Sequence, residues 1–399
     1  MVDIVDARTI GARLRLIRDA RKKSLRVVAG LAGMSKSKLS QIERGEIALD
    51  SISDILALAE ALEVSPAELM RLPVPAPANG QTDSAVKAVF LALMAASRNH
   101  PGGQVRPGEA LRTRITAVLD AHWRGRSSEV GASLPGLIRD LHTSIAAGRD
   151  VAVLLDSAVL LHCHVTVGWL RIAGAAIELR ELAAQLATRV AEDRDTPEAR
   201  GLAVWGGLHV MVTAGGIDLA RVELDSVNVP TRTTEGMQLG GVLALCRSFL
   251  AVADSRPGDL DAPLEYATEL AERTGQGNAY GLGFGPQEVG QWRVLTVLEA
   301  GDAEFAVHLA ESLQQGPAHP IQTRQAQNLI TYGRALARLR LRREDAVRAF
   351  HRAELILPQY LLRDPISREV LAGLLGRVRR DSPAGHELRR MAYRAGLPV

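Results

Sequence analysis

The segment from Ser24 to Gly45, SLRVVAGLAGMSKSKLSQIERG, constrains the fold of this chain more than any other part of it. Serine is favoured just before a helix, because its side chain accepts a hydrogen bond from a backbone N–H group of the first turn. Ser24 and Ser35 therefore predict the starts of two short helices, and Gly33 supplies the turn between them. Two short helices joined by a tight turn form a helix-turn-helix.

The second of these helices has two chemically different sides. Leu39 and Ile42 lie three residues apart, so they share one helix face and are expected to pack against the rest of the domain. The opposite side is polar throughout, as is needed for a helix that enters the major groove of DNA. That polar side carries Lys36, Ser37, Gln41 and Arg44.

Apolar residues recur at helical spacing on both sides of this motif and extend it to a compact domain. Ser65, Pro66 and Glu68 then open a last short helix, with a capping serine, a first-turn proline and an acid near the positive helix end. The pattern predicts five helices within residues 1–72. The apolar positions are Ile10, Leu14 and Ile17 before the motif, and Ile52, Ile55, Leu56, Ala59 and Leu62 after it.

Positive charge is concentrated in this domain. Residues 8–44 contain eleven Lys and Arg against two acids, Asp19 and Glu43, whereas the whole chain has a net charge of only +3. The remainder of the chain is therefore net acidic. A cationic surface of this kind releases counterions from DNA on binding, which is the main source of affinity for the phosphate backbone.

From Arg8 to about Leu72 the chain resembles the DNA-binding domain of the XRE family, the group of the phage Cro and lambda-type repressors. The specific parts are GMSKSKLSQIERGE and VSPAEL. The resemblance implies a domain that binds a double-stranded DNA operator. Two features depart from the family: Leu25 stands where many members have a phosphate-binding glutamine, and the turn GEIALDS is one residue longer than usual and lacks the usual proline.

The resemblance also implies roles for individual residues. Lys36, Ser37 and Gln41 occupy base-reading positions, where lysine can donate to O6 and N7 of guanine and glutamine suits adenine. Arg18 and Glu43 match a pair that forms an internal salt bridge in the family, so Glu43 is expected to be structural. The positions implied to contact phosphates are Lys38, Ser40, Arg44 and Arg26.

Residues 73–84, PVPAPANGQTDS, predict a short linker, because they combine prolines, a glycine and polar residues without an apolar period. Beyond it, over residues 85–399, helical patterns alternate with Gly, Pro and Asp breaks, and almost nothing has the period of a strand. We therefore expect an all-α chain with a second, helical domain. Its helices are expected near 84–98, 108–122, 133–147, 150–172, 175–192, 197–214, 217–227, 236–253, 261–273, 286–299, 303–315, 323–340, 343–356, 365–379 and 384–395.

Some of these helices carry a repeat signal. Ala346, Phe350, Ala353 and Pro358 match the second-helix spacing of a tetratricopeptide repeat, in which small residues let paired helices approach closely. One helix pair cannot bury its apolar face without a neighbour, so the predicted architecture is a degenerate TPR-like α-solenoid. Weaker copies are Ala306, Ala310 and Leu313, and Ala262, Tyr266 and Glu269.

The combination of the two domains resembles that of bacterial regulators in which an XRE-type domain is followed by degenerate helical repeats. The resemblance implies a transcriptional regulator, a homodimer, whose repeat domain senses a peptide or small-molecule effector. The alternative is an antitoxin-like or phage-like repressor whose helical domain binds a protein partner. Polar side chains spaced along the expected inner helices are the candidates for effector binding: Arg324, Asn328, Tyr332, Gln287, Gln291, Trp205 and His209.

No residue pattern points to catalysis, a metal or a cofactor, so we do not expect an enzyme. His162, Cys163 and His164 are adjacent in the sequence, and neighbouring residues of a helix point about 100° apart. Their side chains are therefore not expected to bind one metal ion together. The glycines of YGLGFGPQ lack the preceding strand and the Lys-Ser pair of a phosphate loop. There is no signal peptide pattern, and Cys163 and Cys246 are far apart, so we expect a cytoplasmic protein with reduced thiols and no membrane contact.

Overall fold

The computed structural model describes residues 9–72, 79–316 and 319–399, and within these residues the fold is all-α, without strands. The N-terminal domain consists of five short helices around its own apolar core. These are α1 (Ile10–Ala20), α2 (Leu25–Leu31), α3 (Lys36–Glu43), α4 (Ile52–Leu62) and α5 (Pro66–Leu69).

Side-chain caps define the helix starts of this domain. Ser24 accepts a hydrogen bond from the N–H of Val27, and Ser35 accepts one from the N–H of Lys38. Leu39 and Ile42 are fully buried in the core, as their spacing predicted. Gly11 allows α1 to cross α3 closely, because a Cβ atom at this position would lie only 2.0 Å from the carbonyl oxygen of Ile42.

The rest of the chain forms one helical domain built largely from antiparallel pairs, among them α11 with α12, α14 with α15, α16 with α17 and α18 with α19. The helices are α6 (Gly80–Ser97), α7 (Gly108–Trp123), α8 (Ser127–Ala146), α9 (Val151–Leu160), η2 (Leu161–Thr166), α10 (Val167–Ile172), α11 (Ile177–Arg194), α12 (Pro197–Ala214), α13 (Ile217–Ser226), α14 (Thr234–Ala253), η3 (Pro257–Asp259), α15 (Asp261–Thr274), η4 (Ala279–Gly281), α16 (Pro286–Glu299), α17 (Ala303–Gln314), α18 (Gln322–Arg338), η5 (Arg340–Arg342), α19 (Arg343–Ile356), α20 (Pro358–Arg363), α21 (Pro365–Leu375) and α22 (Pro383–Arg394).

The repeat signal at the end of the chain coincides with a closely packed helix pair. Ala346, Phe350 and Ala353 are completely buried on α19. A Cβ atom at Gly333 of α18 would lie 3.1 Å from the ring of Phe350, so the glycine lets the ring approach the helix backbone. Pro358 begins α20 and ends the pair, in the way expected of a proline after a helix.

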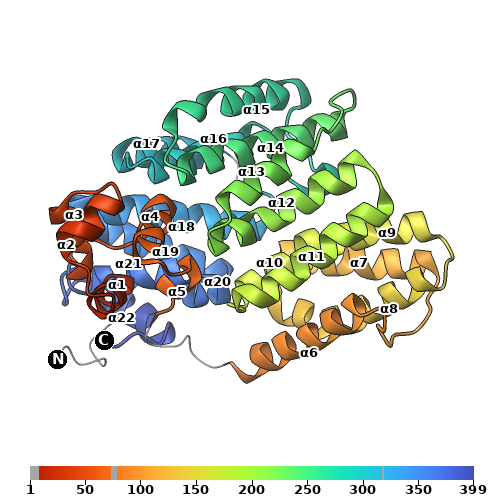
Figure 1. Ribbon diagram of the computed structural model, residues 1–399, viewed down its shortest axis with the longest axis horizontal. Helices are drawn as coiled ribbons and strands as arrows, with labels where there is room; N and C mark the ends of the chain where they lie inside the picture. The colour runs from red at the N-terminus through yellow and green to blue at the C-terminus, as the bar shows by residue number, and fades with distance from the viewer. Residues whose placement is uncertain (1–8, 73–78, 317–318) are drawn as a thin grey trace.

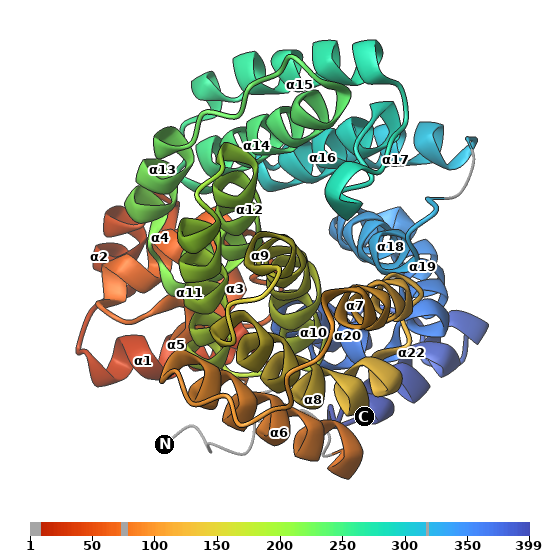
Figure 2. The same ribbon diagram turned by 90° about the vertical axis from the view of Figure 1, so that its right-hand side faces the viewer.

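The helix pairs follow a curved path, so that segments far apart in the sequence come into contact. Helix α7 contacts α18, and α10 contacts α20, although each pair is far apart in sequence. Figure 2 shows the result, in which α9, α12, α16, α18 and α7 follow one another around the inner side of the arc. Side chains from distant helices can therefore converge on this inner side.

Two helical stretches, Val151–Ile172 and Thr234–Ala253, are long and apolar enough to cross a membrane by length and composition. The sequence analysis did not single them out. In each, however, most of the apolar window, 67% and 78% respectively, is buried inside the protein. Both stretches are thus core helices of the helical domain, surrounded by other helices on most of their surface.

Most helix boundaries agree with the sequence-based expectation, and the exceptions have local causes. Helix α8 begins at Ser127 rather than near residue 133, because the buried stripe that includes Val130 and Leu134 continues toward its start. Helix α20 was not predicted, and α21 ends at Leu375 rather than near residue 379. Helix α6 begins at Gly80, inside the predicted linker, of which residues 73–78 lie outside the described residues.

Candidate nucleic-acid interface and its attachment to the helical domain

Helix α3 presents its polar side outward. Lys36 and Ser37, in its first turn, are exposed, and Gln41, one turn further on, is half-buried. The three residues predicted to read bases therefore lie on one accessible side of the helix, opposite the buried Leu39 and Ile42. This is the geometry that a helix needs to place polar side chains against base edges while its apolar face holds it to the domain.

The residues predicted to contact phosphates lie in three different environments. Lys38 forms an ion pair with Asp54 of α4, with 2.7 Å between Nζ and Oδ2. Arg44 is bonded to Glu46 at 2.6 Å through Nε, and its Nη1 donates to the hydroxyl of Ser40 at 2.5 Å. Arg26, at the start of α2, is exposed. Lys38 and Arg44 are thus held in fixed positions by neighbouring acids, which also offset part of their charge.

Arg18 and Glu43 connect the first helix to the recognition helix. The guanidinium of Arg18 donates from Nε and Nη2 to the two carboxylate oxygens of Glu43, at 2.6 and 2.9 Å. The carboxylate side chain is only 4% exposed, and the hydrogen bond to it raises the pKa of Arg18. A bidentate pair of this kind fixes orientation as well as distance, so it locks the end of α3 against α1.

Comparison with known proteins agrees with this geometry: a helix-turn-helix domain family matches residues 9–72. Residues 9–72 form a helix-turn-helix DNA-binding domain. No curated protein and no solved structure matches the chain.

The helix-turn-helix domain is fastened to the helical domain by a buried ion network. Arg334 of α18 lies between two acids, 2.6 Å from the Glu299 carboxylate and 3.5 Å from that of Asp50. Asp50, in the turn before α4, is also bound by Arg338 at 2.9 Å. The other oxygen of Glu299 accepts the N–H of Ile52 at 2.8 Å. Burial opposes ionisation, but Arg338 and Arg334 hold the pKa of Asp50 below its usual value.

Glu369 of α21 makes a second attachment. Its two carboxylate oxygens accept the N–H of Ile10, at 2.6 Å, and the N–H of Leu49, at 3.2 Å. Ile10 is the first residue of α1, so Glu369 supplies an N-terminal cap from the far end of the chain. Glu369 is completely buried, and this burial raises the pKa of its carboxyl group to about 7, although the two N–H groups act in the opposite direction.

Sequence analysis did not identify these attachment residues. Glu299 and Glu369 lie in helices, where glutamate is common on solvated faces, so nothing local distinguishes them. Asp50 lies in the turn GEIALDS, which is longer than is usual in the XRE family. That extra length was the one available signal, and the structure connects this turn to α18 and α21.

On the inner side of the helical arc, two of the predicted effector residues come together. The guanidinium of Arg324 lies over the ring of Trp205, 5.8 Å from its centroid, and 3.7 Å from the carboxylate of Glu288. His164 stacks on Trp205 at 4.6 Å, and Trp123 meets His164 edge-on at 6.2 Å. These five residues, which we call the inner aromatic cluster, come from α7, η2, α12, α16 and α18.

The inner aromatic cluster contains features typical of a binding site. Trp123, Trp205 and Arg324 are each half-buried, although large aromatic rings of a core are usually covered. The Nε2 atom of His164 is buried and has no hydrogen-bond partner among the described residues. Burial, and then the charge of His122, lowers the pKa of His164 to about 3, so the ring is neutral and can accept or donate one further hydrogen bond.

Two of the other predicted effector residues are bonded outside this cluster. Tyr332 donates to Glu311 of α17 at 3.0 Å, and His209 bonds Arg180 of α11 at 2.8 Å. Both side chains thus have partners elsewhere in the protein. Gln287 and Gln291 are half-buried on α16, as is Asn328 on α18.

The histidines of the π-helical segment η2 have structural surroundings. His162 is hydrogen-bonded to His142, with 2.9 Å between their Nε2 atoms, and burial raises the pKa of the Cys163 thiol to about 12.

Elsewhere in the described residues, His351, Glu354 and Glu387 lie close enough together to hold a metal. Arg394 donates to both of these carboxylates, at 2.6 and 3.1 Å, and supplies the positive charge that a metal would otherwise bring.

Proposed function

We propose that this protein is a sequence-specific transcriptional regulator of the XRE type, in which α3 reads base edges and a TPR-like helical domain controls how α3 is presented. The observation that carries the proposal is the outward polar side of α3 within a helix-turn-helix domain. The concentration of positive charge in residues 8–44 supports it. The protein acts in the cytoplasm and has no enzymatic activity in this proposal.

The working unit is a homodimer. One helix-turn-helix reads only about half a turn of the major groove, and two recognition helices about 34 Å apart double the number of specific contacts. Because Asp50 and Glu369 tie the DNA-binding domain to the helical domain, contacts between helical domains would set this spacing. An effector that alters those contacts could then change DNA affinity without touching α3.

The inner aromatic cluster is the proposed effector site. Two tryptophan rings offer flat apolar surface, and Arg324 offers a cation for an acidic group of a peptide or small molecule. Support comes from the half-buried state of these side chains and from the unpaired nitrogen of His164.

Selection of bound duplexes from a random DNA library with the full chain tests the regulator. We expect a near-palindromic motif to be enriched and two protein chains to be bound per duplex, measured by light scattering of the complex. A library that shows no enrichment at any salt concentration would contradict sequence-specific binding. Enrichment of a single half-site by one chain would contradict only the dimer.

A further inference from the structure

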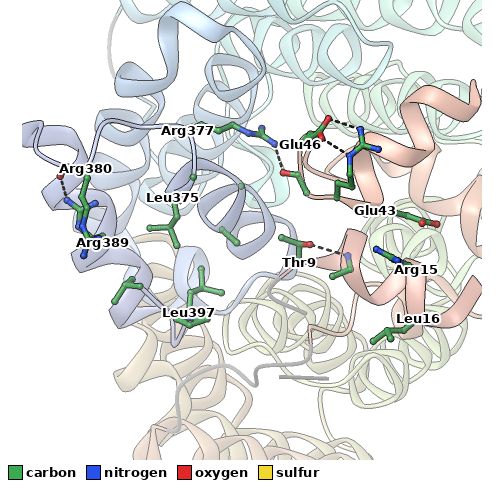
Figure 3. Close-up of a pocket in the computed structure, with 18 of the residues that line it drawn as sticks. Thr9, Arg15, Leu16, Glu43, Glu46, Leu375, Arg377, Arg380, Arg389 and Leu397 are labelled. Carbon is green, nitrogen blue, oxygen red and sulfur yellow. Dashed lines mark hydrogen bonds and ion pairs between the residues drawn. The ribbon is translucent and has the colours of Figure 1, made fainter. Parts of the chain in front are cut away.

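A groove with a volume of about 950 Å³ separates the helix-turn-helix domain from the C-terminal helices (Figure 3). One wall comes from α1 and from the turn that follows α3, and includes Arg15, Gly45 and Glu46. The other wall comes from α21 and the residues around α22. The two walls meet where the guanidinium of Arg377 donates a hydrogen bond to the carbonyl oxygen of Gly45 at 2.5 Å.

The C-terminal wall carries three arginines, Arg377, Arg380 and Arg389, and Arg343 lies near Arg377. We call these four residues the C-terminal arginine patch. Within the described ranges, none of the four has a carboxylate in ion-pair distance. Arg389 donates to the backbone oxygen of Arg380, which keeps their two guanidinium groups in one region. The Nε of Arg343 is buried and has no hydrogen-bond partner among the described residues.

Three other cations of the helix-turn-helix domain differ in having an acidic partner. Arg44 has Glu46, Lys38 has Asp54, and Arg13 has Glu68 at 2.8 Å. An arginine without an acid in ion-pair distance keeps most of its charge available to a polyanion that binds beside it. Burial and then the neighbouring Arg343 lower the pKa of Arg377, whereas Glu369 and Glu46 act in the opposite direction.

The patch borders the same groove as Arg44 and Gly45, which directly follow the recognition helix. Figure 1 places α3, α21 and α22 toward the same end of the molecule, and Figure 3 shows Arg377 pointing across the groove to the turn after α3. In a helix-turn-helix complex, residues around the recognition helix contact the sugar-phosphate backbone on either side of the major groove. The exposed part of that turn, Glu46 and Ile47, directly adjoins the groove.

We propose that the C-terminal arginine patch binds the phosphate backbone of the same DNA duplex that α3 enters, so that the helical domain forms part of the DNA interface. This inference rests on the proposed function, because it requires that the protein bind DNA. Arginine suits the role, since its planar fork of donors matches the geometry of a phosphate group. Phosphate contacts carry no base preference, so the patch adds affinity and fixes orientation while α3 supplies specificity.

The salt dependence of DNA binding tests this proposal. The probe is a 24-base-pair duplex of mixed sequence, and its affinity for the full chain is measured by fluorescence anisotropy between 50 and 300 mM salt. Each phosphate contact contributes about 0.9 to the slope of log K against log salt. We therefore expect the R377Q/R380Q/R389Q variant to lower the slope by about 2 to 3 and to weaken binding at least tenfold at 0.1 M salt.

Two further variants separate a local contact from a general charge effect. The R98Q/R149Q/R232Q variant removes the same charge from three exposed arginines of the helical domain, outside the patch, and should leave the slope close to that of the wild type. The R377K/R380K/R389K variant keeps the charge and should retain most of the slope. Thermal denaturation of each variant shows whether the protein is still folded.

The possible outcomes are distinguishable. A slope for R377Q/R380Q/R389Q equal to that of R98Q/R149Q/R232Q would overturn the patch but leave the regulator intact. Tighter binding by R377Q/R380Q/R389Q would also overturn it, because the C-terminal wall would then obstruct DNA rather than hold it. If the wild type itself bound neither this duplex nor any selected duplex, the proposed function would fail, and the inference with it.

Discussion

The outer face of α3 and the attachment of its domain to α18 and α21 both depend on charged and polar side chains, but in opposite settings. On α3, Lys36 is exposed and keeps its donors available for a partner. At the attachment, Arg334, Glu299 and Asp50 are buried and pair with one another. The difference predicts that changes on α3 alter DNA binding without altering stability. Changes at the attachment should first lower the stability of the protein.

The largest effect should come from Arg334→Met, which keeps the volume of the side chain but removes its charge. Glu299 would then remain buried without its counter-ion, while Asp50 would keep only Arg338, and breaking a buried pair in this way costs about 3 to 5 kcal/mol of unfolding free energy. Urea denaturation of the full chain measures this loss. The matched control is Arg348→Met, because the side chain of Arg348 is 65% exposed and its removal should cost little. Equal stability of the two variants would contradict the role assigned to the network.

An intermediate effect, on binding rather than folding, is expected from Lys36→Ala and from Gln41→Ala. Loss of a side chain that bonds a base edge should cost roughly 1 to 3 kcal/mol of specific affinity and relax the preference at particular base pairs. Anisotropy titrations with the selected operator and with single-base variants of it measure both quantities. Lys87→Ala is the control, since Lys87 is an exposed lysine of α6. Operator affinity and preference that stayed unchanged in both α3 variants would refute the assignment of the recognition helix.

The smallest effect is a pH dependence that originates at Glu369. Its pKa in the folded protein, about 7, lies above the unfolded value of about 4.3, so the folded state binds more protons between these values. Stability should therefore fall as pH rises through this window, by about 1 kcal/mol from pH 6 to pH 8. Buried histidines such as His122 and His142, with pKa values lowered to about 4, act in the opposite direction below pH 6.5.

The comparison of wild type with Glu369→Gln isolates this contribution, because the histidines are common to both proteins. Glutamine stays neutral, like protonated Glu369, so the melting temperatures should differ least at pH 6 and diverge toward pH 8 as the wild type loses stability. A constant difference at all three values would mean that Glu369 does not titrate in this range.

Features that depend on neighbouring residues could be predicted from the sequence. Helix α12 begins at Pro197 and ends at Ala214, as expected, because Thr196 caps its start and Gly215 adopts a positive φ of 92° at its end. The two helices of the helix-turn-helix were predictable for the same reason, from Ser24, Gly33 and Ser35.

Features that depend on the closure of the helical arc could not be predicted. Arg324 of α18 meets Trp205 of α12 only because the arc of helices brings α18 back toward α7, and no local pattern marks that contact. Arg334 and Asp50 are 284 residues apart in sequence, so neither carries a sign of the other. A buried ion pair between domains has no periodicity, unlike an apolar helix face, and it becomes visible only in three dimensions.

The cap that Glu369 places on α1 has a consequence for biosynthesis. The N–H of Ile10 and its partner are separated by 359 residues, so the DNA-binding domain leaves the ribosome long before its cap exists. At roughly 5 to 20 residues per second, the delay is on the order of 20 to 70 seconds. A chain that stops before α21 leaves the N–H groups of Ile10 and Leu49 without their acceptor and lacks the second wall of the groove. Only a chain translated through α21 therefore makes both attachments of its DNA-binding domain, since α18 alone supplies only the one at Asp50.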